Sequence, residues 1–201
     1  MKFTRAELES CRDATVPDLL GPDTRLLFVG INPGLWTAAV QAHFARRGNR
    51  FYPALLRAGV LDTPLDASAG YSAQDHAMLL RRGLGITNLV ARATARADEL
   101  TPDELTTGAQ DLTRLVSQVK PAVVAVLGIT AYRTAFGRRK ALLGRQPEQL
   151  AGAQLWVVPN PSGLNAHFSL AELAESYREV AVAAGVITSG DEPAFETGRS
   201  W

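Results

Sequence analysis

RLLFVGINPG, residues 25–34, joins a continuous apolar run to a turn made of asparagine, proline and glycine. Three other apolar runs have the same character: LGITN at 84–88, AVVAVLG at 122–128 and QLWVVP at 154–159. Strands that are apolar throughout, rather than at alternate positions, are typical of a parallel sheet covered on both faces. We therefore expect four buried strands, the first at 25–30, in a sheet that lies between two layers of helices.

Helix signals separate these runs. A serine or threonine followed three residues later by an acidic residue marks a helix start, because each side chain can cap a backbone N–H group of the other. The pattern occurs at Thr4, Ser72, Thr101 and Ser169. It predicts helices near the N-terminus and over 72–82, 101–119 and 169–185, and a further short helix is expected over 130–136. The alternation predicts an α/β fold, a three-layer domain with a central four-stranded parallel sheet.

The expected domain covers residues 17–186. A chain of 201 residues that is 46% hydrophobic has enough apolar material for one sizeable core. Residues 1–16 would form an N-terminal helical extension. Residues 187–201 are polar and contain glycine and proline, so we expect a mobile tail there.

The composition excludes several function classes. The formal net charge of +1 excludes a strongly basic, histone-like binder, although it allows a local basic face. No apolar run reaches about 18 residues and the first residues are charged, so we expect a cytoplasmic protein with no membrane partner. Cys11 is the only cysteine, which excludes intramolecular disulfides and cysteine-ligated iron–sulfur clusters. The three histidines are scattered, so we expect no metal site and no cofactor.

The turns that follow the strands are the place to look for a site, because ligands of open parallel sheets bind beyond the carboxyl ends of the strands. Residues 30–34 follow the first strand and residues 160–165 follow the fourth, and both turns combine asparagine, proline and glycine. One such turn is usually only a turn. Two of them, each directly after a buried strand, favour a functional site at one edge of the sheet.

Three short motifs resemble a known family. GINPGL at 30–35, NRFY at 49–52 and NPSGL at 160–164 resemble the mismatch-specific uracil-DNA glycosylases, the Mug/thymine-DNA glycosylase branch of the uracil-DNA glycosylase superfamily. The resemblance covers roughly residues 16–184. It implies a uracil-DNA glycosylase-like fold and a DNA repair enzyme that flips uracil out of duplex DNA, preferably from G·U mismatches, and hydrolyses its N-glycosidic bond. The implied partner is double-stranded DNA that contains uracil or a related damaged base.

The resemblance also implies roles for residues near the first motif. Asn32 matches the asparagine that positions the attacking water, and its alternative role is to satisfy the backbone of the turn. Ile31 matches a position whose backbone contacts the base, and Phe44 matches the aromatic residue that stacks on uracil. Phe51 competes with Phe44 for that role, but we interpret it as a core residue. Thr37 lies where a side chain could meet a 5-methyl group, so we expect uracil to be preferred over thymine.

The second motif supplies the DNA-contacting loop in this interpretation. Asn160 matches a residue that helps to hold the base or the scissile region, and Ser162 is expected to contact phosphate unless its hydroxyl merely serves the turn. Gly163, Leu164 and Asn165 match the loop that enters the duplex, with Leu164 as an apolar wedge in place of the flipped base. The loop departs from the family pattern at Asn165 and the residue after it, which leaves the contact to the opposite guanine open.

Charged residues give three further expectations. Lysine occurs only at positions 2, 120 and 140, outside the motif loops, so we expect a monofunctional enzyme that leaves an intact abasic site. Asp98 is a candidate auxiliary acid that would help to orient the water, although the alternative, that it belongs to the solvated approach to the helix at Thr101, is slightly favoured. Arg46 and Arg47 belong to a group of arginines, with those at 50, 92 and 96, that could contact DNA phosphates, and a second basic run occupies 138–140.

A second function class competes with the enzyme. The same fold could serve as a catalytically silent DNA- or nucleotide-binding module, and the intact Asn32 and Asn160 favour the enzyme. An iron–sulfur uracil glycosylase is excluded, because one cysteine cannot hold that cluster. We expect the protein to be monomeric.

Overall fold

Five strands form one sheet in the computed structural model, which describes residues 2–163 and 167–190. They are β1 (Leu26–Gly30), β2 (Leu84–Asn88), β3 (Val123–Leu127), β4 (Gly144–Leu150) and β5 (Ala153–Val158), in the spatial order β2-β1-β3-β5-β4. The register pairs Leu26 of β1 with Leu84 of β2 and with Val123 of β3. The four strands that the sequence predicts, β1, β2, β3 and β5, run parallel, so the predicted fold class is confirmed.

The strand number was predicted wrongly, because the sheet has five strands and not four. β4 pairs with β5 in the antiparallel direction and forms the edge of the sheet. Its sequence, GRQPEQL, buries only Gln146 and Leu150. A strand that is covered on one side and lies at an edge carries no continuous apolar run, so the pattern that identified the parallel strands could not detect it.

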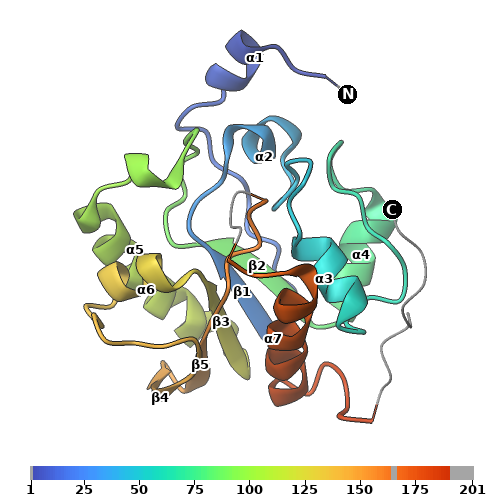
Figure 1. Ribbon diagram of the computed structural model, residues 1–201, viewed down its shortest axis with the longest axis vertical. Coiled ribbons are helices and arrows are strands. Elements are labelled where there is room, and N and C mark those ends of the chain that lie inside the picture. Colours follow the sequence, from blue (N-terminus) through green and yellow to red (C-terminus); the bar gives the residue numbers. More distant parts are fainter. Residues whose placement is uncertain (1, 164–166, 191–201) are drawn as a thin grey trace.

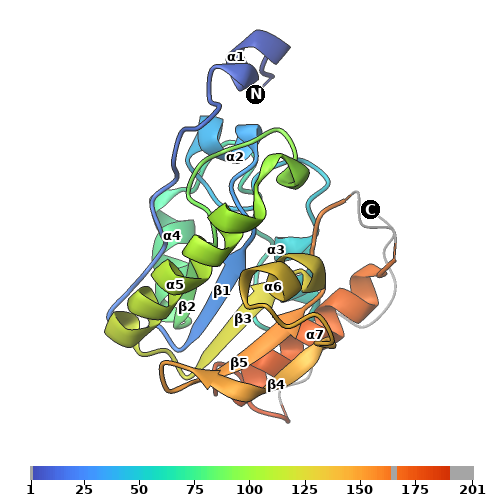
Figure 2. The ribbon, with the colours of Figure 1, turned by 90° about the vertical axis from the view of Figure 1, so that its left-hand side faces the viewer.

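Helices cover both faces of the sheet, as Figures 1 and 2 show. One layer contains α5 (Pro102–Val119) and α6 (Ile129–Ala135), and the other contains α3 (Phe51–Arg57), α4 (Ala73–Arg81) and α7 (Leu170–Ala183). Successive side chains of β1 alternate between the two layers: Phe28 packs with Leu55 and Tyr177, whereas Leu27 packs with Leu112 of α5. The two cores explain why every residue of β1 is buried.

The four helices with a capping box begin where the sequence predicts. Thr4, Ser72, Thr101 and Ser169 are N-caps with complete capping boxes, which fix the starts of α1 (Arg5–Glu9), α4, α5 and α7. Two short helices were not predicted. α2 (Leu35–Val40) is only six residues long and directly follows the first motif, and α3 carries Pro53 in its first turn, where proline is tolerated.

The N-terminal segment, residues 2–16, packs beside the first motif. α1 and α2 lie above the sheet in the views of Figures 1 and 2, at the end where β1 leads into α2. Val16 forms a small apolar cluster with Ala38 of α2 and with Ala93 in the loop after β2. Phe3 packs edge-on against Trp36, with ring centroids 4.9 Å apart. The N-terminal segment therefore joins two of the segments that surround the carboxyl edge of the sheet.

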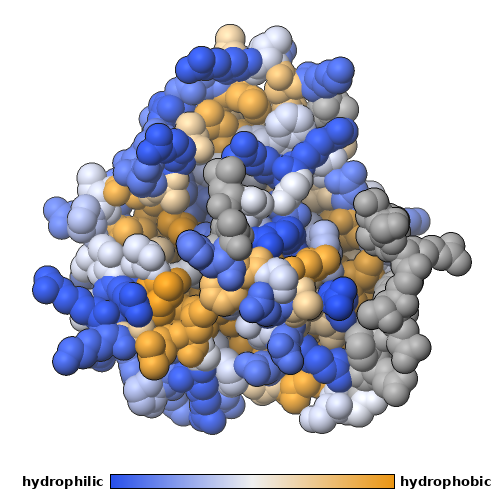
Figure 3. Space-filling model, viewed as in Figure 1, coloured by the Kyte–Doolittle hydropathy of each residue, from blue (hydrophilic) through white to orange (hydrophobic). Residues whose placement is uncertain are grey.

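The surface seen in Figure 3 mixes hydrophilic side chains with smaller apolar areas. Among the described residues, the large hydrophobic side chains that are exposed are Leu142 and Leu143, between α6 and β4. None of the helices in the described ranges is both long enough and apolar enough to span a bilayer. Residues 191–201, most of the predicted tail, lie outside the described ranges.

Candidate active site

A pocket of about 170 Å³ opens at the carboxyl edge of the sheet. Its walls come from the loops after β1, β2 and β5, so the two asparagine–proline–glycine turns converge on one site, as the sequence predicts. The predicted site residues that line it are Ile31, Asn32, Thr37, Phe44, Arg46, Asn160 and Ser162. The site is therefore assembled from turns that are far apart in the sequence and that meet at one edge of the sheet, on either side of β3.

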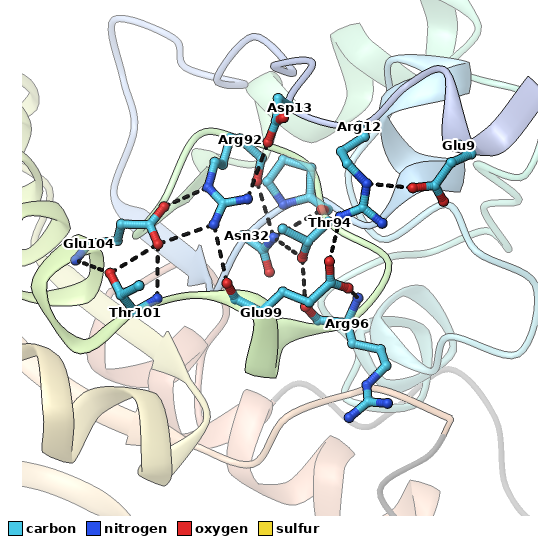
Figure 4. Close-up of polar contacts among 11 residues, drawn as sticks. Glu9, Arg12, Asp13, Asn32, Arg92, Thr94, Arg96, Glu99, Thr101 and Glu104 are labelled. Carbon is cyan, nitrogen blue, oxygen red and sulfur yellow. Dashed lines mark hydrogen bonds and ion pairs between the residues drawn. The ribbon is translucent and has the colours of Figure 1, made fainter.

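The side-chain amide of Asn32 has a defined orientation. Its Nδ2 donates to Thr94 Oγ1 at 2.7 Å, to the carbonyl oxygen of Arg92 at 3.1 Å and to that of Pro33 at 3.2 Å. Backbone carbonyls only accept hydrogen bonds, so the nitrogen must face them and Oδ1 must face away. In Figure 4 the amide oxygen points away from these partners. Within the described chain Oδ1 accepts no hydrogen bond, which leaves it available to a water in the pocket.

Phe44 lies at the pocket wall with its ring stacked on Phe51. The ring centroids are 4.1 Å apart and the planes differ by 29°. Phe51 is fully buried, which agrees with its interpretation as a core residue, whereas Phe44 is partly exposed and lines the pocket. Phe44 has a positive φ of 54°, and its ring lies close to Gly30 of β1. The core thus supports an aromatic ring that forms part of the pocket wall.

Ile31 and Thr37 flank Asn32 in the pocket wall. The carbonyl oxygen of Ile31 accepts from the backbone N–H of Val90 at 3.0 Å, which ties the first motif to the loop after β2. Thr37, on the first turns of α2, is only 6% exposed. Its side chain is held in one place and restricts the volume of the pocket on that side.

Arg50, from the NRFY motif at 49–52, anchors the second motif. The Arg50 guanidinium donates to the carbonyl oxygens of Ser162, at 3.1 Å, and of Phe168. The Asn160 Oδ1 atom accepts from the backbone N–H of Ser162 at 2.9 Å, which shapes the start of the loop. A Cβ atom on Gly163 would lie 2.6 Å from the carbonyl oxygen of Gly48, so this close approach requires glycine.

Two of the predicted DNA-contacting residues, Leu164 and Asn165, lie outside the described residues. Gly163 precedes them and is exposed, but it does not line the pocket. The roles assigned to this loop therefore stay predictions.

The structure does not bring Asp98 into the pocket. It lies in the short 3-10 helix Ala97–Glu99, and its carboxylate pairs with Arg96, whose Nε donates to Oδ1 at 2.9 Å. The hydrogen bond from Arg96 lowers the pKa of Asp98, so the carboxylate is ionised at neutral pH. An auxiliary role for Asp98 stays a prediction, while its position between Arg96 and the Thr101 cap fits the alternative interpretation.

The arginines expected at the DNA-facing edge have different surroundings. Arg46 and Arg47 are exposed and form no ion pair in the described ranges, and Arg46 lines the pocket. Arg50 holds the second motif, and Arg92 pairs with Glu104, with Nε donating to Oε1 at 2.5 Å. Arg50 and Arg92 are therefore engaged within the fold, Arg96 lines the pocket and pairs with Asp98, and phosphate contacts by Arg46 and Arg47 stay a prediction.

Sequence reasoning missed three residues that bring polar side chains to the pocket: His43, Asn88 and Thr94. His43 Nε2 lies 3.0 Å from the carbonyl oxygen of Pro17, so it must carry the proton, and Nδ1 then accepts from Asn88 Nδ2 at 3.4 Å. Burial lowers the pKa of His43 and favours this neutral form. Asn88 ends β2 and could have been found by the rule that identified Asn32, whereas nothing local in the sequence marks Thr94.

Within residues 2–163 and 167–190, no group of three or more histidine, cysteine, aspartate or glutamate side chains is placed so that it could hold a metal ion. The polar groups of the pocket are amides, hydroxyls, an imidazole and guanidinium groups. Such groups can orient water, donate hydrogen bonds and attract phosphates, but an amide cannot take a proton as a carboxylate does.

Comparisons with known proteins agree with this geometry. The sequence model described as the uracil DNA glycosylase superfamily matches residues 17–182. A solved structure with the same fold is the solution NMR structure of a protein from Methanosarcina acetivorans that is described as a "putative Uracil DNA glycosylase". It is 18% identical, has a TM-score of 0.60, and the alignment covers 87% of this chain and 98% of that one.

Proposed function

The chain belongs to the uracil-DNA glycosylase superfamily, and from this premise we propose that it is a DNA repair enzyme that hydrolyses the N-glycosidic bond of uracil in duplex DNA. We further assign it to the mismatch-specific branch, with a preference for G·U pairs, and propose that it works as a monomer in the cytoplasm. The observation that carries the proposal is the fixed amide of Asn32, whose free Oδ1 belongs to a pocket built from both asparagine–proline–glycine turns.

The proposed chemistry depends on departure of the base. As the bond breaks, positive charge develops on the sugar and negative charge on the leaving uracil, and a water completes the hydrolysis. Asn32 Oδ1 accepts a hydrogen bond from this water and so directs a lone pair of the water towards the sugar carbon. Because an amide does not remove the proton, the protein must gain most of its rate from positioning and from stabilising the uracil anion.

The pocket has suitable groups for the base. The exposed part of the Phe44 ring offers an aromatic face, and stacking of a base on such a face contributes about 1–3 kcal/mol in other nucleic-acid sites. Asn88 carries a donor and an acceptor on one amide, which complement the O4 and N3–H groups of uracil. The backbone N–H groups of Ile31 and Asn32 donate no hydrogen bond within the described chain, so they can serve the uracil carbonyls.

We assign binding of the DNA backbone to exposed groups around the pocket. Arg46 and Arg47 would contact phosphates, Ser162 would add a hydroxyl, and the loop from Gly163 through Leu164 and Asn165 would fill the space left by the flipped nucleotide. The positions of the three lysines support a monofunctional reaction, because none of these lysines lines the pocket.

One assay tests the proposal. Purified protein is incubated with matched duplexes that contain G·U, A·U or G·T and with single-stranded uracil DNA, and abasic sites are scored by alkaline cleavage. We expect excision of uracil, fastest from G·U, and a loss of at least about 100-fold in Asn32→Ala because the water loses its orientation. Absence of excision from every uracil substrate would favour the alternative, a catalytically silent DNA-binding module.

A further inference from the structure

The partners of Asn32 come mainly from the loop after β2. Two of its three acceptors, the Arg92 carbonyl and the Thr94 hydroxyl, belong to this loop, and the third belongs to the adjacent Pro33. An amide nitrogen has two hydrogens, so three acceptors share them. The contact to Thr94 Oγ1 is the shortest of the three at 2.7 Å.

The Thr94 hydroxyl also has a fixed direction. Thr94 is 1% exposed, and its hydroxyl donates to the carbonyl oxygen of Arg96 at 2.7 Å. Because its one proton is used there, the oxygen presents a lone pair towards Asn32. A half-turn of the Asn32 amide would place Oδ1 against two carbonyl oxygens and leave the Thr94 lone pair without a donor, so the observed orientation is strongly favoured.

The segment that carries Thr94 is itself held on two sides. The backbone N–H of Thr94 donates to the carbonyl of Pro33 at 3.1 Å, and Ala93 exchanges two backbone hydrogen bonds of 2.9 Å with Asp13 and Ala14. Asp13 also pairs with Arg92 at 3.2 Å, as Figure 4 shows. The loop after β2 is thus hydrogen-bonded to the N-terminal segment on one side and to the first motif on the other.

Ion pairs add further contacts between the loop after β2 and its neighbours. Glu99 accepts from the backbone N–H of Arg96 at 2.7 Å and pairs with Arg12 of the N-terminal segment. On the other side Arg92 lowers the pKa of Glu104 to about 2, so this pair stays charged throughout the neutral range. The loop therefore cannot shift without breaking contacts to both α5 and the N-terminal segment.

We propose that Thr94 is a positioning residue of the glycosylase reaction: its hydroxyl, bridged between Asn32 and the Arg96 carbonyl, fixes the amide so that Oδ1 is presented to the attacking water. The inference rests on the proposed function, because it assigns Thr94 a role in the same hydrolysis. It is distinct from a base-binding role, since Thr94 acts through Asn32.

The test compares two threonine-to-valine variants. Thr94→Val keeps the shape and removes the hydroxyl. Thr87→Val is the matched control, because Thr87 is also buried, its hydroxyl donates to Asp18 at 2.7 Å, and it does not line the pocket. We expect single-turnover uracil excision to fall about 10- to 100-fold in Thr94→Val, with unchanged affinity for duplex that carries a non-cleavable 2′-fluoro-deoxyuridine. Thr94→Ser, which retains the hydroxyl, should stay near the wild-type rate.

A double mutant separates positioning from a general structural effect. If Thr94 acts through Asn32, Thr94→Val should add no further loss in an Asn32→Ala background. Full activity of Thr94→Val, a loss equal to that of Thr87→Val, or the same loss in the Asn32→Ala background would each overturn the inference. Should the valine variant not fold, Thr94→Ala takes its place in every comparison.

The two failures can be told apart. Wild-type protein that excises uracil while Thr94→Val does so equally well contradicts only the positioning role. Wild-type protein that excises uracil from no substrate contradicts the proposed function and the positioning role with it.

Discussion

The Arg50 guanidinium donates to the carbonyl oxygen of Ser162 at 3.1 Å and so ties the NRFY motif at 49–52 to the second motif, whose loop forms part of the pocket wall. Both residues belong to segments that resemble glycosylase motifs, and the backbone N–H of Arg50 adds a second link, to the carbonyl of Pro161, at 3.0 Å. The position of the loop that carries Asn160 therefore depends in part on a residue that lies outside the pocket wall.

The first prediction concerns Arg50→Lys. A lysine keeps the charge but cannot reach two carbonyls with a planar fork, so we expect a loss of about 1–3 kcal/mol in the free energy of unfolding. Uracil excision should fall about tenfold, because the second loop moves relative to the water. Denaturant unfolding and single-turnover kinetics measure the two effects. Arg47→Lys is the control, since Arg47 is exposed and unpaired within the described chain, and equal behaviour of the two variants would contradict the role of Arg50.

The second prediction concerns Thr37→Ala. Thr37 is buried in the pocket wall, where we expect it to obstruct the 5-methyl group of thymine. Removing its side-chain atoms should raise the ratio of G·T to G·U excision about tenfold, within the range for a methyl-sized change in a pocket. The ratio of single-turnover rate constants is the measurement, and Thr134→Ala on the far part of α6 is the control. An unchanged ratio would mean that another group excludes thymine.

The sequence could predict the strand ends and the convergence of Asn32 and Asn160, because continuous apolar runs indicate parallel strands and their carboxyl ends share one edge. It could not predict the partner of Asn32. Thr94 lies 62 positions away, in a loop that backbone hydrogen bonds hold against Pro33 on one side and against the N-terminal segment on the other. Charge alone also could not reveal the contacts of Arg50, since a guanidinium that holds carbonyls and one that holds phosphates have the same sequence signal.

The third prediction concerns the product. Strand cleavage by a bifunctional glycosylase proceeds through a Schiff base with an amine. Lys2, Lys120 and Lys140 do not line the pocket, so borohydride should trap no covalent adduct with uracil-containing duplex, and the product should be an intact abasic strand. The assay runs beside a bifunctional glycosylase as the positive control. A trapped adduct, separated by denaturing electrophoresis, would contradict the monofunctional reaction.

The fourth prediction separates the two interpretations of Asp98. Its carboxylate is exposed and does not line the pocket, although its partner Arg96 does. From this geometry we expect Asp98→Ala to retain the wild-type single-turnover rate within about twofold, since most surface substitutions have small effects. A loss comparable to that of Asn32→Ala would instead establish Asp98 as an auxiliary acid and would require the loop to move when DNA binds.

The fifth prediction concerns pH and His43. His43 is 2% exposed, and burial lowers its pKa below the ordinary value of 6.5 because the charged form loses hydration. Protonation would also require Nδ1 to donate, although it faces the Asn88 amide nitrogen, which is itself a donor. The native state therefore favours the neutral imidazole.

The sign of the pH effect follows from this preference. Above pH 6.5 the histidine is neutral in both states and its contribution to stability is complete. As the pH falls below 6.5 the unfolded chain binds a proton that the native state does not, so the free energy of unfolding decreases down to the lowered pKa. We expect the melting temperature to fall between pH 7 and pH 5 and His43→Gln to flatten this fall. His76→Gln, at an exposed position, should leave the wild-type slope unchanged. Equal slopes for all three proteins would show that His43 is not the group that titrates.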